Sequence, residues 1–67
     1  MAEITLNGKK ESIARAVPVG DFLESKNIGP GKVVVEINRE IIGKEEYATR
    51  NICPGDSVEL VTFVGGG

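Results

Sequence analysis

Apolar and polar residues alternate at the start of the chain. Ile4 and Leu6 are apolar, whereas Glu3, Thr5 and Asn7 are polar. A period of two is typical of a half-buried β-strand. Asn7-Gly8 comes next, and this pair favours a two-residue hairpin turn because both residues tolerate positive φ. Ile13 lies beyond a polar stretch on the far side of this turn. The pattern therefore predicts an opening β-hairpin over roughly residues 2–16.

The following segment changes to a helical period. Pro18 suits the first turn of a helix, where its missing N–H removes no hydrogen bond. Val19, Phe22 and Leu23 then share one face, at i, i+3 and i+4. Gly29-Pro30-Gly31 ends the pattern. We expect a helix of about ten residues that packs its apolar face on a sheet, because so short a helix is unstable alone in water.

The middle of the chain returns to the strand period. Val33, Val35 and Ile37 occupy every second position, which predicts a strand with one buried face. Asn38-Arg39-Glu40 then turns the chain. Ile41-Ile42 is long enough only for a short strand.

The last third of the chain predicts one more strand. Residues 44–47 are expected to form a single helical turn. Cys53-Pro54-Gly55-Asp56 is a strong turn signal, and residues 57–64 follow it as the final strand. Val58 and Leu60 occupy one face of that strand.

The predicted order is β-β-α-β-β-β, an α+β arrangement compatible with a β-grasp. One helix on one face of a mixed sheet of about five strands gives two layers. Residues 1–64 form the predicted domain and residues 65–67 a flexible glycine tail. The expected core consists of Ile4, Leu6, Ile13, Phe22, Leu23, Val35, Ile37, Val58 and Leu60.

Composition narrows the functional classes. With 67 residues, 40% of them hydrophobic and 27% charged, the chain is expected to be one folded domain. A net charge of −2 supplies no basic face, so neither nucleic acid nor a membrane is an expected partner. No apolar stretch approaches the about 20 residues of a membrane span, and the start lacks the pattern of a signal peptide. With Cys53 as the single cysteine, these features predict a cytoplasmic protein.

The side chains offer little catalytic chemistry. The chain has no histidine, which excludes Ser–His and Cys–His nucleophile pairs and removes the common nitrogen ligand of zinc. Glu45 and Glu46 are interpreted as solvated surface residues. Nothing basic or metal-binding surrounds Cys53 in the sequence to activate its thiol, so we assign it a structural or incidental role. We therefore expect no catalytic residue, no metal site and no bound cofactor.

The end of the last strand is more informative. Val61 and Phe63 lie on the strand face opposite Val58 and Leu60. If the helix covers only one face of the sheet, these two side chains are exposed and, with Val64, form a candidate docking site for a partner. The alternative is that a loop covers them.

Gly65, Gly66 and Gly67 end the chain directly after this strand. Glycine has no Cβ, so such a tail is narrow and can thread through a slot into another protein's active site. The group that it would deliver is the carboxylate of Gly67, which becomes an acyl electrophile once ATP has converted it to an acyl adenylate. The alternative is an end that frays without function.

Three segments together resemble a known family. Residues 35–42, the turn Pro54-Gly55-Asp56 and the ending 61–67 are similar to the ThiS family, the sulfur carrier proteins of thiamine biosynthesis. The resemblance extends over nearly the whole length and implies a ubiquitin-like β-grasp fold.

The resemblance also implies a mechanism in which the chain is a substrate and not an enzyme. An E1-like, zinc-containing adenylyltransferase would use MgATP to adenylate Gly67. Sulfur from a cysteine desulfurase or a rhodanese-type persulfide would displace AMP, and the resulting thiocarboxylate would supply thiazole synthase. Gly66 and Gly67 correspond to the terminal pair of the family, and Gly65 adds flexibility.

Three alternatives remain open from the residues. The small subunit of molybdopterin synthase shares the fold, the terminus and the activation chemistry, although it tends to be longer. A protein modifier would join the same terminus to lysines through an isopeptide bond. A plain binding module would not use its terminus at all.

Overall fold

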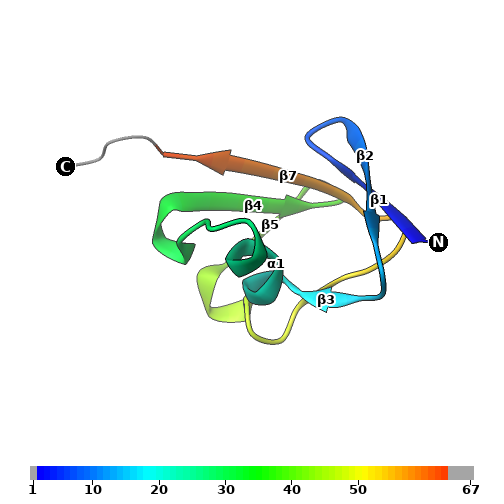
Figure 1. Cartoon of the computed structure of the whole chain (residues 1–67). Helices are drawn as coiled ribbons and strands as arrows, with labels where there is room; N and C mark the ends of the chain where they lie inside the picture. The colour runs from blue at the N-terminus through cyan, green and yellow to red at the C-terminus, as the bar shows by residue number, and fades with distance from the viewer. Residues whose placement is uncertain (1, 64–67) are drawn as a thin grey trace.

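The computed structural model describes residues 2–63 and has one helix against a five-stranded mixed sheet (Figure 1). The strands follow the order β2-β1-β7-β4-β5, with β1 and β7 parallel and the other neighbours antiparallel. The elements are β1 (Ala2–Leu6), β2 (Lys9–Ile13), β3 (Val17–Pro18), α1 (Val19–Ser25), β4 (Val33–Ile37), β5 (Glu40–Ile42), β6 (Asn51–Ile52) and β7 (Ser57–Thr62), with short 3-10 helices at Pro30–Lys32 and Lys44–Glu46. This is the predicted α+β, ubiquitin-like β-grasp architecture.

Two tight turns set the antiparallel pairs of the sheet. Asn7 and Gly8 have φ values of 49° and 83° and close the hairpin of β1 and β2 as predicted. Asn38 and Arg39 have φ values of 52° and 71° and close the hairpin of β4 and β5. Positive φ at both central residues matches the right-handed twist of the flanking strands, which is why such turns join neighbouring strands.

Helix α1 is shorter than predicted, with seven residues instead of about ten. Asn27 has a φ of 60°, and the N–H of Ile28 donates to the carbonyl of Leu23 over 2.9 Å. The N–H of Asn27 donates to the carbonyl of Glu24 over 3.0 Å, which completes a Schellman ending with asparagine in the left-handed position. The helix therefore ends before Gly29, because Asn27 supplies the conformation expected of glycine.

The core lies between α1 and the inner face of the sheet. Its buried members are Ile4, Val19, Phe22, Leu23, Val33, Val35, Ile37, Ile42, Tyr47, Ile52 and Val58. Three predicted core residues, Leu6, Ile13 and Leu60, are only partly buried at its margin. Ile13 ends the edge strand β2, where there is no neighbouring strand to cover it.

A second, two-stranded sheet was not predicted. Val17 pairs with Ile52 and Pro18 with Asn51, while the N–H of Gly20 donates to the carbonyl of Tyr47 over 2.8 Å. This small sheet closes one side of the core. Ile52 of β6 is buried there, and so is Tyr47, which precedes β6 in the chain. Strands of two residues have no readable period, so only the packing reveals them.

Candidate functional site

Strand β7 carries the candidate site and lies at the centre of the sheet. It pairs with β1 on one side and β4 on the other, and it ends one residue before Phe63. The N–H of Phe63 donates to the carbonyl of Lys32 over 2.9 Å, so regular pairing with the neighbouring segment continues to that residue. The pairing with β1 covers only Ser57 and Val58, so the last residues of β7 are held in the sheet by β4.

The start of β7 is tied down by side chains as well as by the sheet. Asn38 accepts a hydrogen bond from the N–H of Ser57 at 2.9 Å and donates one to Asp56 Oδ1 at 3.1 Å. Asp56 Oδ2 in turn accepts from the N–H of Cys53 at 2.8 Å. The thiol of Cys53 is exposed and free. The turn at residues 53–56 is thus fixed by Asp56 and Asn38, and the role of Cys53 stays a prediction.

Val61 and Phe63 are exposed, as predicted, at 56% and 54% of their surface. Within residues 2–63 no loop covers them, so the alternative of a covering loop is wrong for the described chain. Val61 pairs across the sheet with Val34, and Ile41 on β5 is also exposed, at 67%. Val34, Val61 and Ile41 lie on the sheet face opposite α1, which we call the outer face, and Glu36 is the cross-strand neighbour of Ile41. Docking at Val61, Phe63 and Val64 stays a prediction, and the sequence interpretation did not foresee the exposure of Ile41.

The outer face also carries an unfavourable charge pair. Glu36 and Glu59 are directly opposite each other on β4 and β7, and neither forms an ion pair within residues 2–63. Like charges opposite each other destabilise a sheet. The centre of the outer face is therefore negative, between the exposed side chains of Ile41 and Val61.

Val64 and the glycines Gly65, Gly66 and Gly67 lie outside the described residues, so their predicted roles stay predictions. Within residues 2–63 no group of three or more Cys, His, Asp or Glu side chains could hold a metal ion. None of the helices in that part of the chain is long and apolar enough to cross a membrane.

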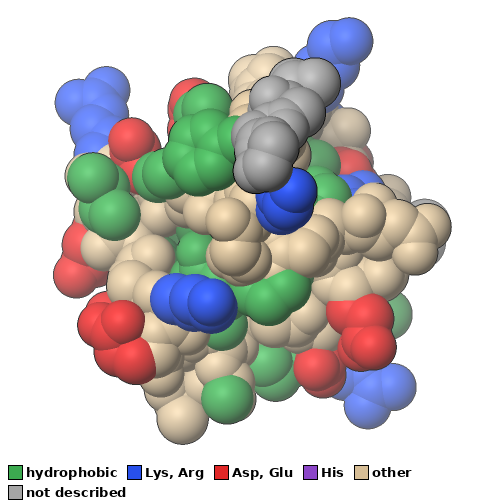
Figure 2. All heavy atoms as spheres, turned by 90° about the vertical axis from the view of Figure 1, so that its left-hand side faces the viewer, with side chains coloured by type: hydrophobic (Ala, Val, Ile, Leu, Met, Phe, Trp, Pro, Cys, Tyr) green, Lys and Arg blue, Asp and Glu red, His purple; other side chains and the backbone are tan. Residues whose placement is uncertain are grey.

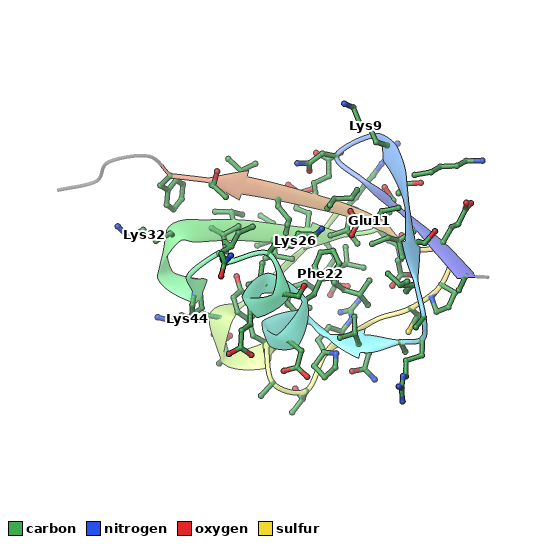
Figure 3. All side chains as sticks on the ribbon, viewed as in Figure 1. Lys9, Glu11, Phe22, Lys26, Lys32 and Lys44 are labelled. Atoms are coloured by element: carbon green, nitrogen blue, oxygen red, sulfur yellow. The ribbon has the colours of Figure 1, made fainter. Side chains whose placement is uncertain are left out.

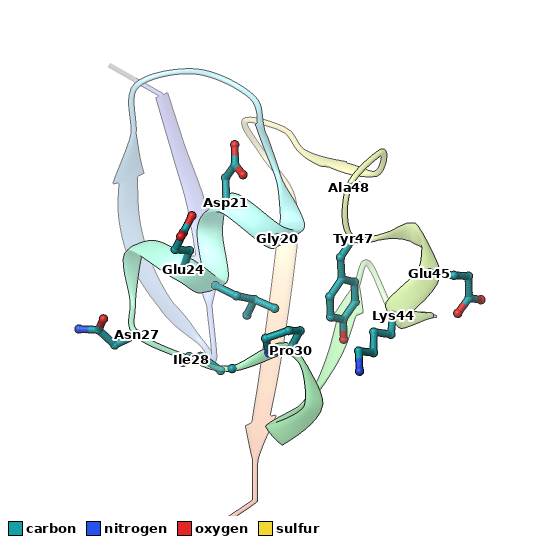
Figure 4. A pocket seen from close by; sticks show the side chains of 12 residues that line it. Gly20, Asp21, Glu24, Asn27, Ile28, Pro30, Lys44, Glu45, Tyr47 and Ala48 are labelled. Atoms are coloured by element: carbon teal, nitrogen blue, oxygen red, sulfur yellow. The ribbon is translucent and has the colours of Figure 1, made fainter.

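An open groove of about 740 Å³ separates α1 from the 3-10 helix at Lys44–Glu46 (Figure 4). Leu23, Ile28 and the ring of Tyr47 contribute apolar surface, and Asp21 and Glu24 are the carboxylates of α1 that line it. Burial, followed by the nearby charge of Glu45, raises the pKa of Tyr47 above its ordinary value of 10.0. The phenol is therefore neutral at physiological pH and is not a base. No motif in the sequence indicated this groove.

The geometry of residues 2–63 first defines a class, the ubiquitin-like β-grasp proteins. Comparison with known proteins identifies a family within this class. The ThiS family matches residues 2–67. The sulfur carrier protein ThiS of Bacillus subtilis (strain 168) is 42% identical over 65 residues, which cover 96% of this chain and 98% of that protein. The chain therefore belongs to the ThiS family of sulfur carrier proteins, as the resemblance predicted.

Two further similarities bear on fold and partners. The crystal structure of the thiamine biosynthesis protein ThiS from Geobacter metallireducens aligns with a TM-score of 0.83 at 31% identity, covering 97% of this chain and 99% of that one. A thiazole synthase of Paramagnetospirillum magneticum (strain ATCC 700264 / AMB-1) is 34% identical over 65 residues, which cover 97% of this chain but only 20% of that protein. A segment similar to this carrier is thus part of some thiazole synthases.

Proposed function

We propose that this ThiS-family protein carries sulfur on the carboxylate of Gly67 for formation of the thiazole ring of thiamine. An E1-like adenylyltransferase binds MgATP, and a carboxylate oxygen of Gly67 attacks the α-phosphorus of ATP. Pyrophosphate leaves, and the product is an acyl adenylate. The chain needs no acid, base or metal of its own for this step, because the enzyme supplies them.

Sulfur then replaces the adenylate. The terminal sulfur of a persulfide, on a cysteine desulfurase or a rhodanese-type protein, attacks the acyl carbon and AMP leaves. The carbon is then bound to the donor through an acyl disulfide. A thiol attacks the donor-side sulfur and breaks the S–S bond, which leaves the Gly67 thiocarboxylate and a disulfide that contains the donor. The electrons for this reduction come from that thiol.

Thiazole synthase is the proposed acceptor of the sulfur. The match of a carrier-like segment within thiazole synthases supports this partner, since domains joined in one chain often act on each other. Gly65 and Gly66 allow the tail to enter the active sites of both enzymes, because a chain without side chains is narrow. All these partners act in the cytoplasm, and the chain itself is a substrate in each step.

Docking is assigned to the end of β7. Val61, Phe63 and Val64 precede the tail, Val61 and Phe63 are exposed, and an exposed apolar patch beside a functional terminus is suited to contact a partner. The single observation that carries the proposal is that the family match extends through Gly67, beyond the central strand β7 and its exposed apolar residues.

Intact mass after reconstitution tests the proposal. The protein is incubated with a ThiS-activating enzyme, MgATP, a persulfide donor and a thiol, with the variant that lacks Gly67 as control. The expected product has gained the mass difference between sulfur and oxygen, and the control is unchanged. A ladder of larger adducts would instead indicate a protein modifier, and an unchanged wild-type mass would refute the carrier function. The same spectra verify that Gly67 is the last residue of the mature protein.

A further inference from the structure

The two edges of strand β7 are paired over different lengths. On one edge β4 accompanies it from Val58 to Thr62, and the hydrogen bond from Phe63 to Lys32 continues this ladder. On the other edge the pairing with β1 ends at Val58. Beyond that point β1 turns away into its hairpin with β2 (Figure 1). In Figure 3 Lys32 lies at the far end of β7, whereas Lys9 marks the hairpin.

The backbone of Thr62 is open on this second edge. Successive residues of a strand direct their N–H and C=O groups toward opposite neighbours, and Phe63 donates toward β4. On the side of β1, the carbonyl of Val58 accepts from the N–H of Asn7, and the side chain of Asn7 binds both backbone groups of Leu60. Thr62 is the next residue in this series. Within residues 2–63 neither its N–H nor its carbonyl has a hydrogen-bond partner on that edge.

The residues on either side of Thr62 do not protect this edge. Natural sheets shield exposed edges with charged side chains, proline or bulges. Val61, Thr62 and Phe63 are instead exposed residues of types that favour strands. Figure 2 looks onto this end of the molecule, where hydrophobic side chains lie at the surface. The edge is therefore suited to pair with an extended segment of another chain.

We infer that an extended segment of the activating enzyme adds to β7 at Thr62 as a further strand and continues along the tail. This inference rests on the proposed function and names how its first partner holds the carrier. Strand addition gains affinity from main-chain hydrogen bonds, which any polypeptide can form, so it requires no particular charge on the enzyme. Asn7 sets the register, because it already occupies both backbone groups of Leu60. The added strand therefore begins at Thr62.

Strand pairing also suits the delivery of the terminus. Each residue of a strand rises about 3.3 Å, so the five residues that follow Thr62 would hold Gly67 about 17 Å beyond it. An unpaired chain samples shorter distances as well, and ordering it costs conformational entropy. The hydrogen bonds of the added strand offset part of that cost. Because the glycines have no side chains, the enzyme can close over both faces of the paired tail.

Amide hydrogen exchange followed by NMR gives the first test. The isotope-labelled carrier is measured alone and in complex with the unlabelled activating enzyme, without ATP. In the free carrier the N–H of Thr62 should exchange quickly, and that of Phe63 more slowly because it is bound to Lys32. In the complex the exchange of Thr62 should slow at least about tenfold, since its N–H becomes part of a ladder.

A proline variant with a matched control gives the second test. Thr62→Pro removes the N–H that the added strand requires. The ladder with β4 keeps its bonds, because this N–H faces away from β4. Thr62→Ala is the control, since it also loses the hydroxyl but retains the N–H. Thermal unfolding first verifies that both variants are folded, and the Kd for the activating enzyme is then measured without ATP.

The proline variant is expected to bind about tenfold more weakly than the alanine variant. Equal affinities of the two variants, or fast exchange of Thr62 in the wild-type complex, would each overturn the strand addition. If Thr62→Pro does not fold, the exchange of the wild type decides the question alone. A wild type that does not bind the enzyme would also overturn it. A carrier that binds with Thr62 protected but is never adenylated would refute only the proposed function.

Discussion

The side-chain amide of Asn7 pairs with both backbone groups of Leu60. Asn7 Oδ1 accepts the N–H of Leu60 at 2.8 Å, and Asn7 Nδ2 donates to its carbonyl at 3.3 Å. The parallel pairing of β1 with β7 has just ended at Leu6 and Val58. Asn7 therefore continues that ladder with a side chain while its own backbone turns into the hairpin. One residue both closes the hairpin and fixes the strand that leads to the tail.

Replacing Asn7 by glycine separates these two roles. Glycine accepts the φ of 49°, so the turn is preserved and only the two amide hydrogen bonds to Leu60 are lost. We expect the free energy of unfolding to fall by about 1–3 kcal/mol, since two hydrogen bonds are lost and each contributes about 0.5–1.5 kcal/mol. Urea denaturation measures the loss. An unchanged midpoint would show that water replaces the amide without cost.

Phe63→Ala should impair activation and leave the fold intact. The side chain is 54% exposed, and surface substitutions usually change stability by less than about 0.5 kcal/mol. The KM for the carrier should rise about fivefold to tenfold, the equivalent of about 1–1.4 kcal/mol of docking energy. Steady-state adenylation kinetics give this value.

Ile41→Ala is the matched control for this change. Ile41 is similarly exposed but lies on β5, two strands away from β7. Its KM should change less than that of Phe63→Ala. A loss of 2 kcal/mol or more in the stability of Phe63→Ala would place Phe63 in the core and contradict the docking role.

Glu59→Lys should stabilise the domain. The substitution replaces the repulsion between Glu36 and Glu59 with an attractive cross-strand pair, and such pairs contribute roughly 0.2–1 kcal/mol. A small rise in melting temperature is expected at low salt, and it should shrink as salt is added. Glu3→Lys, which makes the same charge change at an exposed position of β1, is the control for net charge. An equal rise in both variants would refute the pairwise explanation.

Ionisation of the Tyr47 phenol should lower the free energy of unfolding at high pH. Its pKa in the folded state lies above the ordinary value of 10.0, first because it is buried and then because Glu45 is negative. The unfolded chain therefore releases this proton at a lower pH than the folded protein does. The stabilising effect is complete below the unfolded pKa of 10.0 and is lost as the pH rises through the folded pKa.

Tyr47→Phe isolates this effect from the titration of the lysines. The free energy of unfolding is measured for both proteins at several pH values on either side of 10.0. Wild type should lose stability more steeply than the variant above that pH. Parallel curves would show that the ring carries no shifted pKa.

Short-range patterns accounted for most of the elements. The alternation around Ile4 and Val35 predicted their strands, and Asn7-Gly8 predicted its turn, because side-chain period and turn geometry depend on neighbouring residues only. The end of α1 was misplaced because asparagine and glycine both adopt positive φ. Asn27 precedes Gly29 in the chain, and its positive φ ends the helix first.

Part of the candidate site could be predicted from the sequence, and part could not. The glycine run and the family resemblance pointed to the end of the chain, and the alternation of β7 correctly placed Val61 and Phe63 on its outer face. The proximity of Lys32 to Phe63 could not be predicted, since it depends on the pairing of β4 with β7. That register is set by packing between segments that are far apart in sequence.

The sequence by itself determined most of the local elements and the family, since these depend on residue type, spacing and the order of motifs. The tertiary structure decided the parallel pairing of β1 with β7, the two-residue strands β3 and β6, the burial of Tyr47 and the clamp of Asn7 on Leu60. Each of these joins residues distant in the chain. Such contacts form only when the whole core packs, because the entropy lost in closing long loops must be offset by many buried contacts at once.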